Sequence, residues 1–396
     1  MIDLNELSMQ EVGRRLKLAR ENARVRQERA AEKIQVSRPT LVSIEQGSRR
    51  IKIKELQILA NLYGTSVNAL LRREAVHTDL LPRFRRLNDT DDGEMRFAVE
   101  LFNDLIRADV ELENVLGIPR RKEYPPERGI TEGDVEALAE RNAQLLRNHL
   151  GLGSGPIANI FSLIEFDLGI RLYQRRVPSK IAGLFTFDEM VGACILLNAN
   201  HPMQRRIQSA GHELGHFDGT RFNPEVLELN EKFSSRDERY ADAFGRAFLT
   251  PKETFAEHFY KLKQLCGTDK LSRKLVILLA DQFNISREAC VKRLEDLGLA
   301  RKGSWEWFEK KDGITIDDAV EVLGDSARRQ DPYKLDADRL LSHRMSLMAH
   351  AVWKRELMSE GQLAELLKVS RIDLRKIVDE IELDEEESDE LFKLPN

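Results

Sequence analysis

One short segment constrains this chain more than any other. Residues 212–216 read His-Glu-Leu-Gly-His, and they lie in a stretch, 203–217, that we expect to form one helix. Histidines at i and i+4 project from one face of a helix, so His212 and His216 can share a zinc ion. Glu213 lies beside that ion, where its carboxylate can deprotonate water. The competing explanation is an exposed helix with two histidines.

A catalytic zinc has three protein ligands, and the third is expected on another helix. Residues 235–250 form a predicted helix that Pro251 ends. We assign Glu238 in its first turn as the third ligand, and Asp242 as the residue that accepts a hydrogen bond from the N–H of a ligand histidine. The segment Ser235 to Glu238 also matches a capping box, in which the glutamate would turn back to the Ser235 N–H.

Composition limits the class of protein and its organisation. The chain has 396 residues, 41% of them hydrophobic, which is enough for two or three domains with real cores. Three cysteines exclude a disulfide framework and a cysteine zinc finger. No apolar run is long enough to span a membrane and no signal sequence is present, so we expect a soluble, cytoplasmic protein without membrane contact.

Charge is unevenly distributed along the chain. Residues 1–71 hold 13 Lys and Arg against 8 Asp and Glu, whereas the whole chain has a net charge of −5. A basic head on an acidic body suggests that the head meets a polyanion. At the other end, residues 379–390 hold nine acids in twelve positions and predict a solvated tail.

The basic head contains a helix-turn-helix pattern. Five short helices are expected over residues 8–72, and residues 27–47 hold two of them joined by a turn at Val36. The N-terminal part of the second helix of such a motif enters the major groove of double-stranded DNA. On the outward face of the second helix, the residues assigned to the DNA surface are Arg38, Pro39, Thr40 and Ser43. The residues assigned to phosphate contacts are Gln27, Arg49, Arg50 and Lys52.

Residues 10–71 resemble the XRE/Cro phage-repressor family. The residues that carry the likeness are Arg20, Gln27, Ala31, Val36, Ser37, Leu41, Ile44, Glu45, Gly47 and Leu70. The resemblance implies a structural ion pair between Arg20 and Glu45, binding to an operator, and a homodimer. A five-helix bundle that only mediates dimerisation or binds protein is the alternative.

The middle of the chain changes from helical to strand periodicity. After helices at 131–150 and 157–169, residues 170–176, 182–188 and 193–199 alternate as three short strands, and helices then resume. We expect the strand at 193–199 to offer an open edge that holds an extended substrate. The Pro-rich stretch 118–131 is a linker or an ordered surface loop.

Residues 135–265 resemble the ImmA/IrrE metallopeptidase family. The likeness rests on the HELGHF segment, on ERYADAFGRAFLTP, and on the helix and strands before them. It implies a zincin-like core with one zinc ion held by His212, His216 and Glu238, and Glu213 as the catalytic base. Gly211 stands where alanine is usual and Asp242 where asparagine is commoner.

The expected fold is therefore mainly α with a small β-sheet, an α+β protein. The expected domains are a five-helix DNA-binding bundle (1–72), a charged connector (73–134), a metallopeptidase core (135–265) and a helical C-terminal region with an acidic tail (266–396). Within the last, residues 359–377 repeat a helix-turn-helix pattern, which we interpret as a packed helical pair in preference to a second DNA contact. Tyr240, His201 and His258 are candidate oxyanion donors.

Three functions fit these residues. The first is a DNA-binding regulator with a zinc endopeptidase that cleaves a helix-turn-helix repressor, as relatives in the resembled family do. The second is a transcription factor whose zinc domain senses or scaffolds without cleaving. The third is an autoprocessing regulator that cuts its own segment at 118–131. Two imidazoles and a carboxylate suit zinc among the divalent metals.

Overall fold

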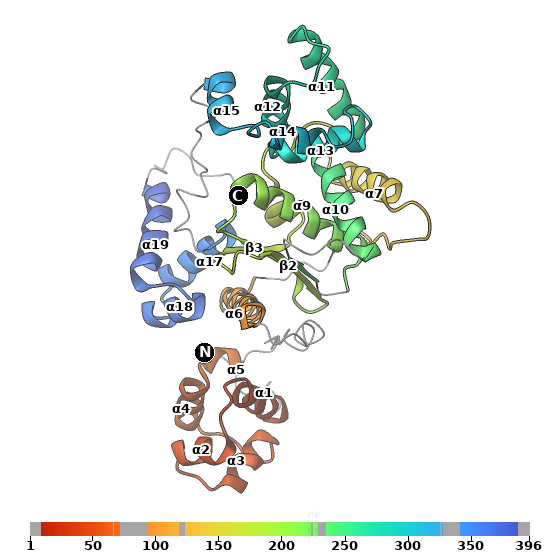
Figure 1. Ribbon diagram of the computed structural model, residues 1–396. Helices are drawn as coiled ribbons and strands as arrows, with labels where there is room; N and C mark the ends of the chain where they lie inside the picture. Colours follow the sequence, from red (N-terminus) through yellow and green to blue (C-terminus); the bar gives the residue numbers. More distant parts are fainter. Residues whose placement is uncertain are drawn as a thin grey trace. The chain divides into compact units, whose positions relative to one another are not determined.

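A computed structural model describes residues 9–65, 67–71, 93–118, 123–222, 225–228, 235–324, 327 and 341–386. These residues form helices and one four-stranded sheet, which confirms the expected mainly α fold with a small β-sheet (Figure 1). The chain divides into two compact units, and two of the divisions fall within described residues, between Phe102 and Asn103 and between Arg344 and Met345. Within the described residues, no helix is both long and apolar enough to cross a membrane.

The first unit contains the predicted five-helix bundle. Its helices are α1 (Met9–Asn22), α2 (Gln27–Lys33), α3 (Arg38–Glu45), α4 (Ile53–Tyr63) and α5 (Val67–Leu71). Ser37 caps α3 by accepting a hydrogen bond from the Thr40 N–H at 3.3 Å, and Gly64 ends α4 in the left-handed conformation. The buried side chains of these helices form a hydrophobic cluster of their own.

A buried ion pair lies within this bundle. Arg20 donates to both carboxylate oxygens of Glu45, at 2.6 and 3.2 Å, and both side chains are almost fully buried. The structure thus contains the pair that the phage-repressor resemblance implies. Because the guanidinium and the carboxylate meet in two parallel bonds, the pair fixes the end of α3 against α1.

The sheet lies in the second unit and has the order β1-β3-β2-β4. Its strands are β1 (Arg171–Arg175), β2 (Ile181–Asp188), β3 (Gly192–Asn198) and β4 (Glu225–Glu228). β3 is parallel to β1 and antiparallel to β2, and all its residues are buried. The expectation that residues 193–199 offer an open edge is therefore wrong. Their continuous apolar run is typical of a central strand covered on both faces.

Two helices carry the candidate metal ligands. α9 (Met203–Gly219) packs on β2 and β3, and α10 (Arg236–Leu249) packs against α9 and against α7 (Val135–His149) (Figure 1). Small residues allow α9 and α10 to approach closely. A Cβ added to Gly215 would lie 2.5 Å from the Cα of Ala241, and one added to Gly245 would lie 2.7 Å from the carbonyl carbon of Gly211.

The hydrophobic cluster of the second unit continues past α10. It includes side chains from α11 (Lys252–Leu265), α12 (Arg273–Gln282), α13 (Arg287–Asp296), α14 (Ser304–Glu309) and α15 (Ile316–Leu323). Before the sheet, residues 157–169 form not one helix but the short α8 (Ile160–Ser162) followed by a π-helix, Leu163–Asp167. Tyr124 and Ile130, from the stretch expected to be a linker or surface loop, also pack against this cluster.

The remaining helices are α6 (Gly93–Leu116), α17 (His343–Lys354), α18 (Glu360–Leu367) and α19 (Arg371–Glu386). The first residues of α6 belong to the second unit, where Phe102 contacts Tyr173 of β1 edge to face. α18 begins with a complete capping box, and Ser370 caps α19 through its bond from the Asp373 N–H. Residues 379–386 of the acidic segment end α19, and residues 387–390 lie outside the described part.

Candidate metal centre

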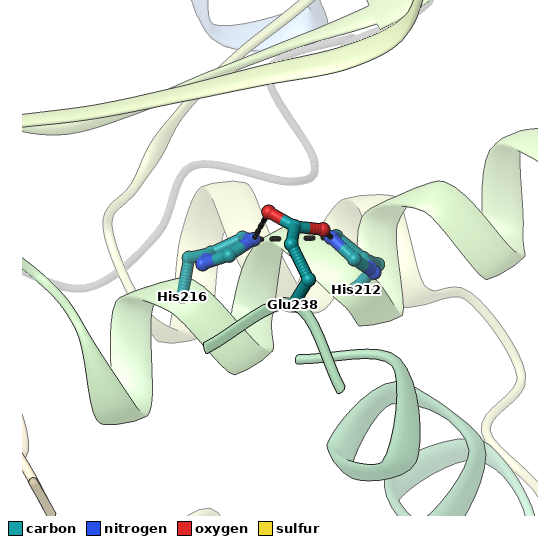
Figure 2. A group of neighbouring side chains, drawn as sticks. All are labelled: His212, His216 and Glu238. Atoms are coloured by element: carbon teal, nitrogen blue, oxygen red, sulfur yellow. Dashed lines mark hydrogen bonds and ion pairs between the residues drawn. The ribbon is translucent and has the colours of Figure 1, made fainter. Parts of the chain in front are cut away.

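The two histidines of the HELGH segment meet on one face of α9. Their Nε2 atoms lie 3.0 Å apart, and His212 and His216 are 4% and 1% exposed (Figure 2). Thr220, which follows the last turn of α9, contacts the other ring nitrogen of His216, with 3.0 Å between Oγ1 and Nδ1. A partner on the outer nitrogen fixes the ring orientation and leaves Nε2 facing His212.

Glu238 completes the group from the first turn of α10. Its carboxylate oxygens lie 3.3 Å from Nε2 of His212 and 3.4 Å from Nε2 of His216 (Figure 2). Ser235 does cap the helix, because its hydroxyl accepts from the Glu238 N–H at 3.1 Å. The glutamate side chain, however, points to the histidines. Only the serine half of the capping box is therefore formed, and the glutamate half, which competed with the ligand assignment, is not.

The donor set fits a zinc ion. One ligand atom from each of the three residues lies within 4.8 Å of the others, and the atoms are two imidazole nitrogens and a carboxylate oxygen. Burial raises the pKa of the Glu238 carboxyl, but the hydrogen bonds and charges of the two histidines outweigh it and lower that pKa below its ordinary value. The carboxylate is thus ionised, as a metal ligand must be.

Glu213 points toward the sheet and has no exposed surface. A Cβ added to Gly183 of β2 would lie only 2.3 Å from its Oε1 atom, so the carboxylate lies directly against the backbone of β2. Phe185, two residues further along β2, stacks on the ring of His216 with centroids 6.5 Å apart. β2 therefore borders both the candidate base and one candidate ligand.

The Asp242 side chain has an arginine partner in the structure. Its carboxylate pairs with Arg246 one turn further along α10, and Arg246 also contacts Asp296 at 3.2 Å. The outer nitrogen of His216 contacts Thr220 instead. For His216 the structure thus shows Thr220 in the place expected of Asp242. As the acceptor for the other ligand histidine, Asp242 stays a prediction.

The three candidate oxyanion donors form hydrogen bonds with residues other than the candidate metal ligands. The hydroxyl of Tyr240 donates to Asp218, ring nitrogen Nε2 of His201 lies 2.9 Å from the carbonyl oxygen of Ser179, and Nδ1 of His258 lies 2.9 Å from Oε1 of Gln282. Each side chain has another partner in the structure, and the oxyanion role stays a prediction for all three.

Sequence reasoning missed a buried polar network behind the metal helices. Asp218 accepts hydrogen bonds from Tyr240, at 2.9 Å, and from Arg128, and Asn142 donates to the Tyr240 hydroxyl at 2.8 Å. Burial raises the pKa of Asp218 to about 6, although Arg128 and Tyr240 favour its charged form. The network ties α9, α10 and α7 together, but its members are too distant in sequence for spacing to reveal them.

A second missed residue, Arg221, holds the segment 123–130 against the end of α9. Its guanidinium lies 4.1 Å from the centroid of the Phe217 ring and donates to the carbonyl oxygen of Pro125 at 2.8 Å. The Arg221 N–H donates to Glu127 at 2.8 Å. Of the two interpretations of this stretch, the described part is an ordered segment with defined contacts.

Several of the expected DNA-contact residues interact within the bundle. Gln27 donates to Glu45 at 3.0 Å and accepts from Arg38 at 3.3 Å. Exposed Arg38 also pairs with Glu28 at 3.1 Å. Both Arg38 and Gln27 lie at the start of their helices, where a helix-turn-helix protein contacts DNA.

The other expected DNA-contact residues lie on α3 or between α3 and α4. Exposed Pro39 and half-buried Thr40 and Ser43 lie on α3, and the Ser43 hydroxyl donates to the carbonyl oxygen of Pro39 at 3.0 Å. Arg50 is exposed, whereas both guanidinium NH groups of Arg49 bond to Glu55, at 3.0 and 3.3 Å. Arg49 thus has a structural partner at the start of α4.

Comparisons with known proteins agree with both resemblances. Residues 11–73 match the profile of a helix-turn-helix domain, and residues 166–295 match the profile of the IrrE N-terminal-like domain, a peptidase family. The chain thus combines a helix-turn-helix DNA-binding domain with an IrrE-like peptidase domain.

Whole-chain comparisons add little to this. No curated protein matches the sequence significantly. The crystal structure of ComR from Streptococcus suis aligns over 96% of each chain at 12% identity, with a TM-score of 0.16. So low a TM-score supports no inference about the arrangement or function of this chain.

Proposed function

We propose that this protein is a DNA-binding regulator with a zinc-dependent endopeptidase that cleaves a repressor-like protein. The observation that carries the proposal is that His212, His216 and Glu238 come together, with Glu213 next to His212 on the same helix. Two histidines and a carboxylate would supply three protein ligands, which is the count of a catalytic zinc site.

The chain's own residues have distinct roles in this mechanism. His212, His216 and Glu238 would hold the ion, which would supply a Lewis acid for the scissile carbonyl and for water. The Glu213 carboxylate accepts the proton of the attacking water and passes it to the leaving amine.

The proposed substrate is a helix-turn-helix repressor, as the ImmA/IrrE resemblance implies. The bundle formed by α1–α5 would bring the peptidase to an operator, with Arg38 at the start of α3 and Arg50 after its end among the exposed cations. A homodimer and a cytoplasmic location, the compartment that holds the DNA, belong to the same proposal.

Glu213→Gln tests the catalytic part. We expect the variant to retain about one zinc per chain by elemental analysis, because its ligands are intact, and to lose at least about a thousandfold in cleavage of a co-encoded repressor. Glu253→Gln, an exposed position at the start of α11, is the matched control and should cleave normally. Full activity in the Glu213 variant would exclude this residue as the base.

A zinc-binding sensor that cleaves nothing is the second candidate. It is favoured by one observation, the presence of β4 on the edge of β2 beside Glu213. In that case wild type and Glu213→Gln would bind zinc equally, leave every co-encoded repressor intact and regulate transcription identically.

A further inference from the structure

β2 is the strand from which a peptide could reach the candidate base. The Glu213 carboxylate lies against Gly183, and the ring of His216 stacks on Phe185. An extended peptide binds to a sheet by pairing with the free backbone groups of an edge strand. β3 already takes one side of β2, so a peptide would pair with the other side.

That side of β2 is occupied by the chain itself. β4 pairs with it antiparallel, with Leu227 opposite Gly183 and Glu225 opposite Phe185. β4 comes from the connection between α9 and α10, the two helices that hold the candidate ligands. It therefore covers the two positions of β2 that border the candidate base and ligand.

β4 and a substrate cannot use this edge together. Both would take the same N–H and C=O groups of β2. A peptide on the outer edge of β4 instead would lie about 4.8 Å further from Glu213, one strand spacing, and beyond its reach.

The β2–β4 ladder has features of a displaceable pairing. It spans four residues of β4, and its register shifts between Ile181 and Gly183. A short and irregular pair of strands is marginal by itself, and an incoming peptide would replace each backbone hydrogen bond that is lost.

We propose that β4 occupies the edge of β2 at which the substrate would pair, so that the peptidase is latent. It becomes active when β4 leaves β2 and an extended segment of the target protein pairs there in its place. This inference rests on the proposed function, because it assumes that the site cleaves peptides. An activator of this protein would act by drawing β4 away from β2.

Two opposite variants of the full-length, zinc-loaded protein test the proposal. Val226→Pro with Leu227→Pro removes two backbone donors from β4 and should release it. Val226→Ala with Leu227→Ala keeps those donors and is the matched control. Leu184→Cys with Val226→Cys joins two residues that are opposite in register, so its disulfide should lock β4 in place, and Leu184→Cys alone is its control.

The first readout is cleavage of fluorescently labelled casein, an unfolded protein. We expect the proline variant to cleave at least about tenfold faster than wild type, and the oxidised disulfide variant to fall below wild type until it is reduced. Zinc content should be unchanged in all of them. If wild type cleaves and the proline variant is no faster, the latency inference is wrong and the proposed function stands.

A second readout does not depend on cleavage. A synthetic peptide with the sequence of residues 223–230, NPEVLELN, should slow hydrogen exchange of the amides at 181–185 in the proline variant but not in wild type. Protection without cleavage in any zinc-loaded variant would remove the endopeptidase function and keep the exchange of strands. Absence of protection would overturn the inference.

Discussion

Thr220 shows how a residue that binds no metal can set the geometry of a metal ligand. It caps the C-terminus of α9, and its hydroxyl contacts the outer ring nitrogen of His216 at 3.0 Å. Without that partner the imidazole is free to rotate or to adopt the other tautomer, and its Nε2 atom is no longer held toward His212.

We therefore expect Thr220→Val to weaken zinc binding about 10- to 100-fold while the fold is kept, since valine has nearly the same shape. Competition with a fluorescent zinc chelator measures the affinity. Thr250→Val is the matched control, because Thr250 also ends a helix, is 2% exposed and bonds at 2.6 Å to the carbonyl oxygen of Arg246. Equal affinities in both variants would show that Thr220 does not orient the ligand.

At the scale of elements, the crossing of α9 and α10 decides whether three ligands meet. The first helix supplies two histidines and the second supplies Glu238, so their separation sets the size of the site. Gly215 lies where the helices touch, and a Cβ there would be 2.5 Å from the Cα of Ala241 and 2.8 Å from its carbonyl oxygen. Both are backbone atoms, which move only if the helix moves.

Gly215→Ala should consequently push the helices apart. We expect a loss of about 1–3 kcal/mol in the free energy of unfolding and weaker zinc binding, because Glu238 moves with α10. Chemical denaturation and zinc titration measure the two effects. Gly93→Ala, at a helical glycine with no atom within 4 Å of the added Cβ, should leave zinc binding unchanged and should not lower the free energy of unfolding. Normal zinc binding by Gly215→Ala would contradict this account of the crossing.

The same turn recurs at three places, with different surroundings. Gln35, Asn284 and Lys368 each adopt a left-handed conformation, and each is followed by an aliphatic residue and a serine that caps the next helix. Residues 359–386, around the third copy, hold nine acids and four basic residues. Because that charge repels phosphates, the packed-pair interpretation of α18 and α19 remains preferable to a DNA contact.

At the scale of the whole molecule, the two candidate activities lie in different units. The buried side chains of the DNA-binding bundle form a cluster between Val12 and Leu71, and the metal ligands belong to the other unit. The hydrophobic cluster of the bundle contains no residue of the metal cluster.

Removal of zinc by a chelator should accordingly abolish cleavage and leave DNA affinity unchanged within about twofold. Fluorescence anisotropy with a DNA duplex selected from random sequences measures the affinity, at a fixed salt concentration. His216→Ala should behave like the chelated protein, which separates loss of the metal from other effects of the chelator. Release of DNA on metal removal would mean that the two units are coupled.

Sequence patterns that act within one helix predicted most of the candidate site. The i, i+4 spacing put His212 and His216 on one face, and the serine caps marked the starts of α3 and α10. Sequence analysis failed where a partner came from another element. The sequence did not predict β4, and it predicted an edge strand where β3 is a central strand. Strand order depends on pairings that no local pattern encodes.

The amino-acid sequence by itself determined most of the helices, three of the four strands, the five-helix bundle, and the residue types that gather near Glu213, while the Arg20–Glu45 pair followed from the resemblance to the phage repressors. Local hydrogen bonding and periodicity act over a few residues, so they can be read along the chain. Only the tertiary structure decided the contact of Glu238 with both histidines, the pairing of Asp242 with Arg246, and the occupation of the β2 edge by β4. These depend on how closely packed helices and strands approach, which is set by side chains far apart in sequence.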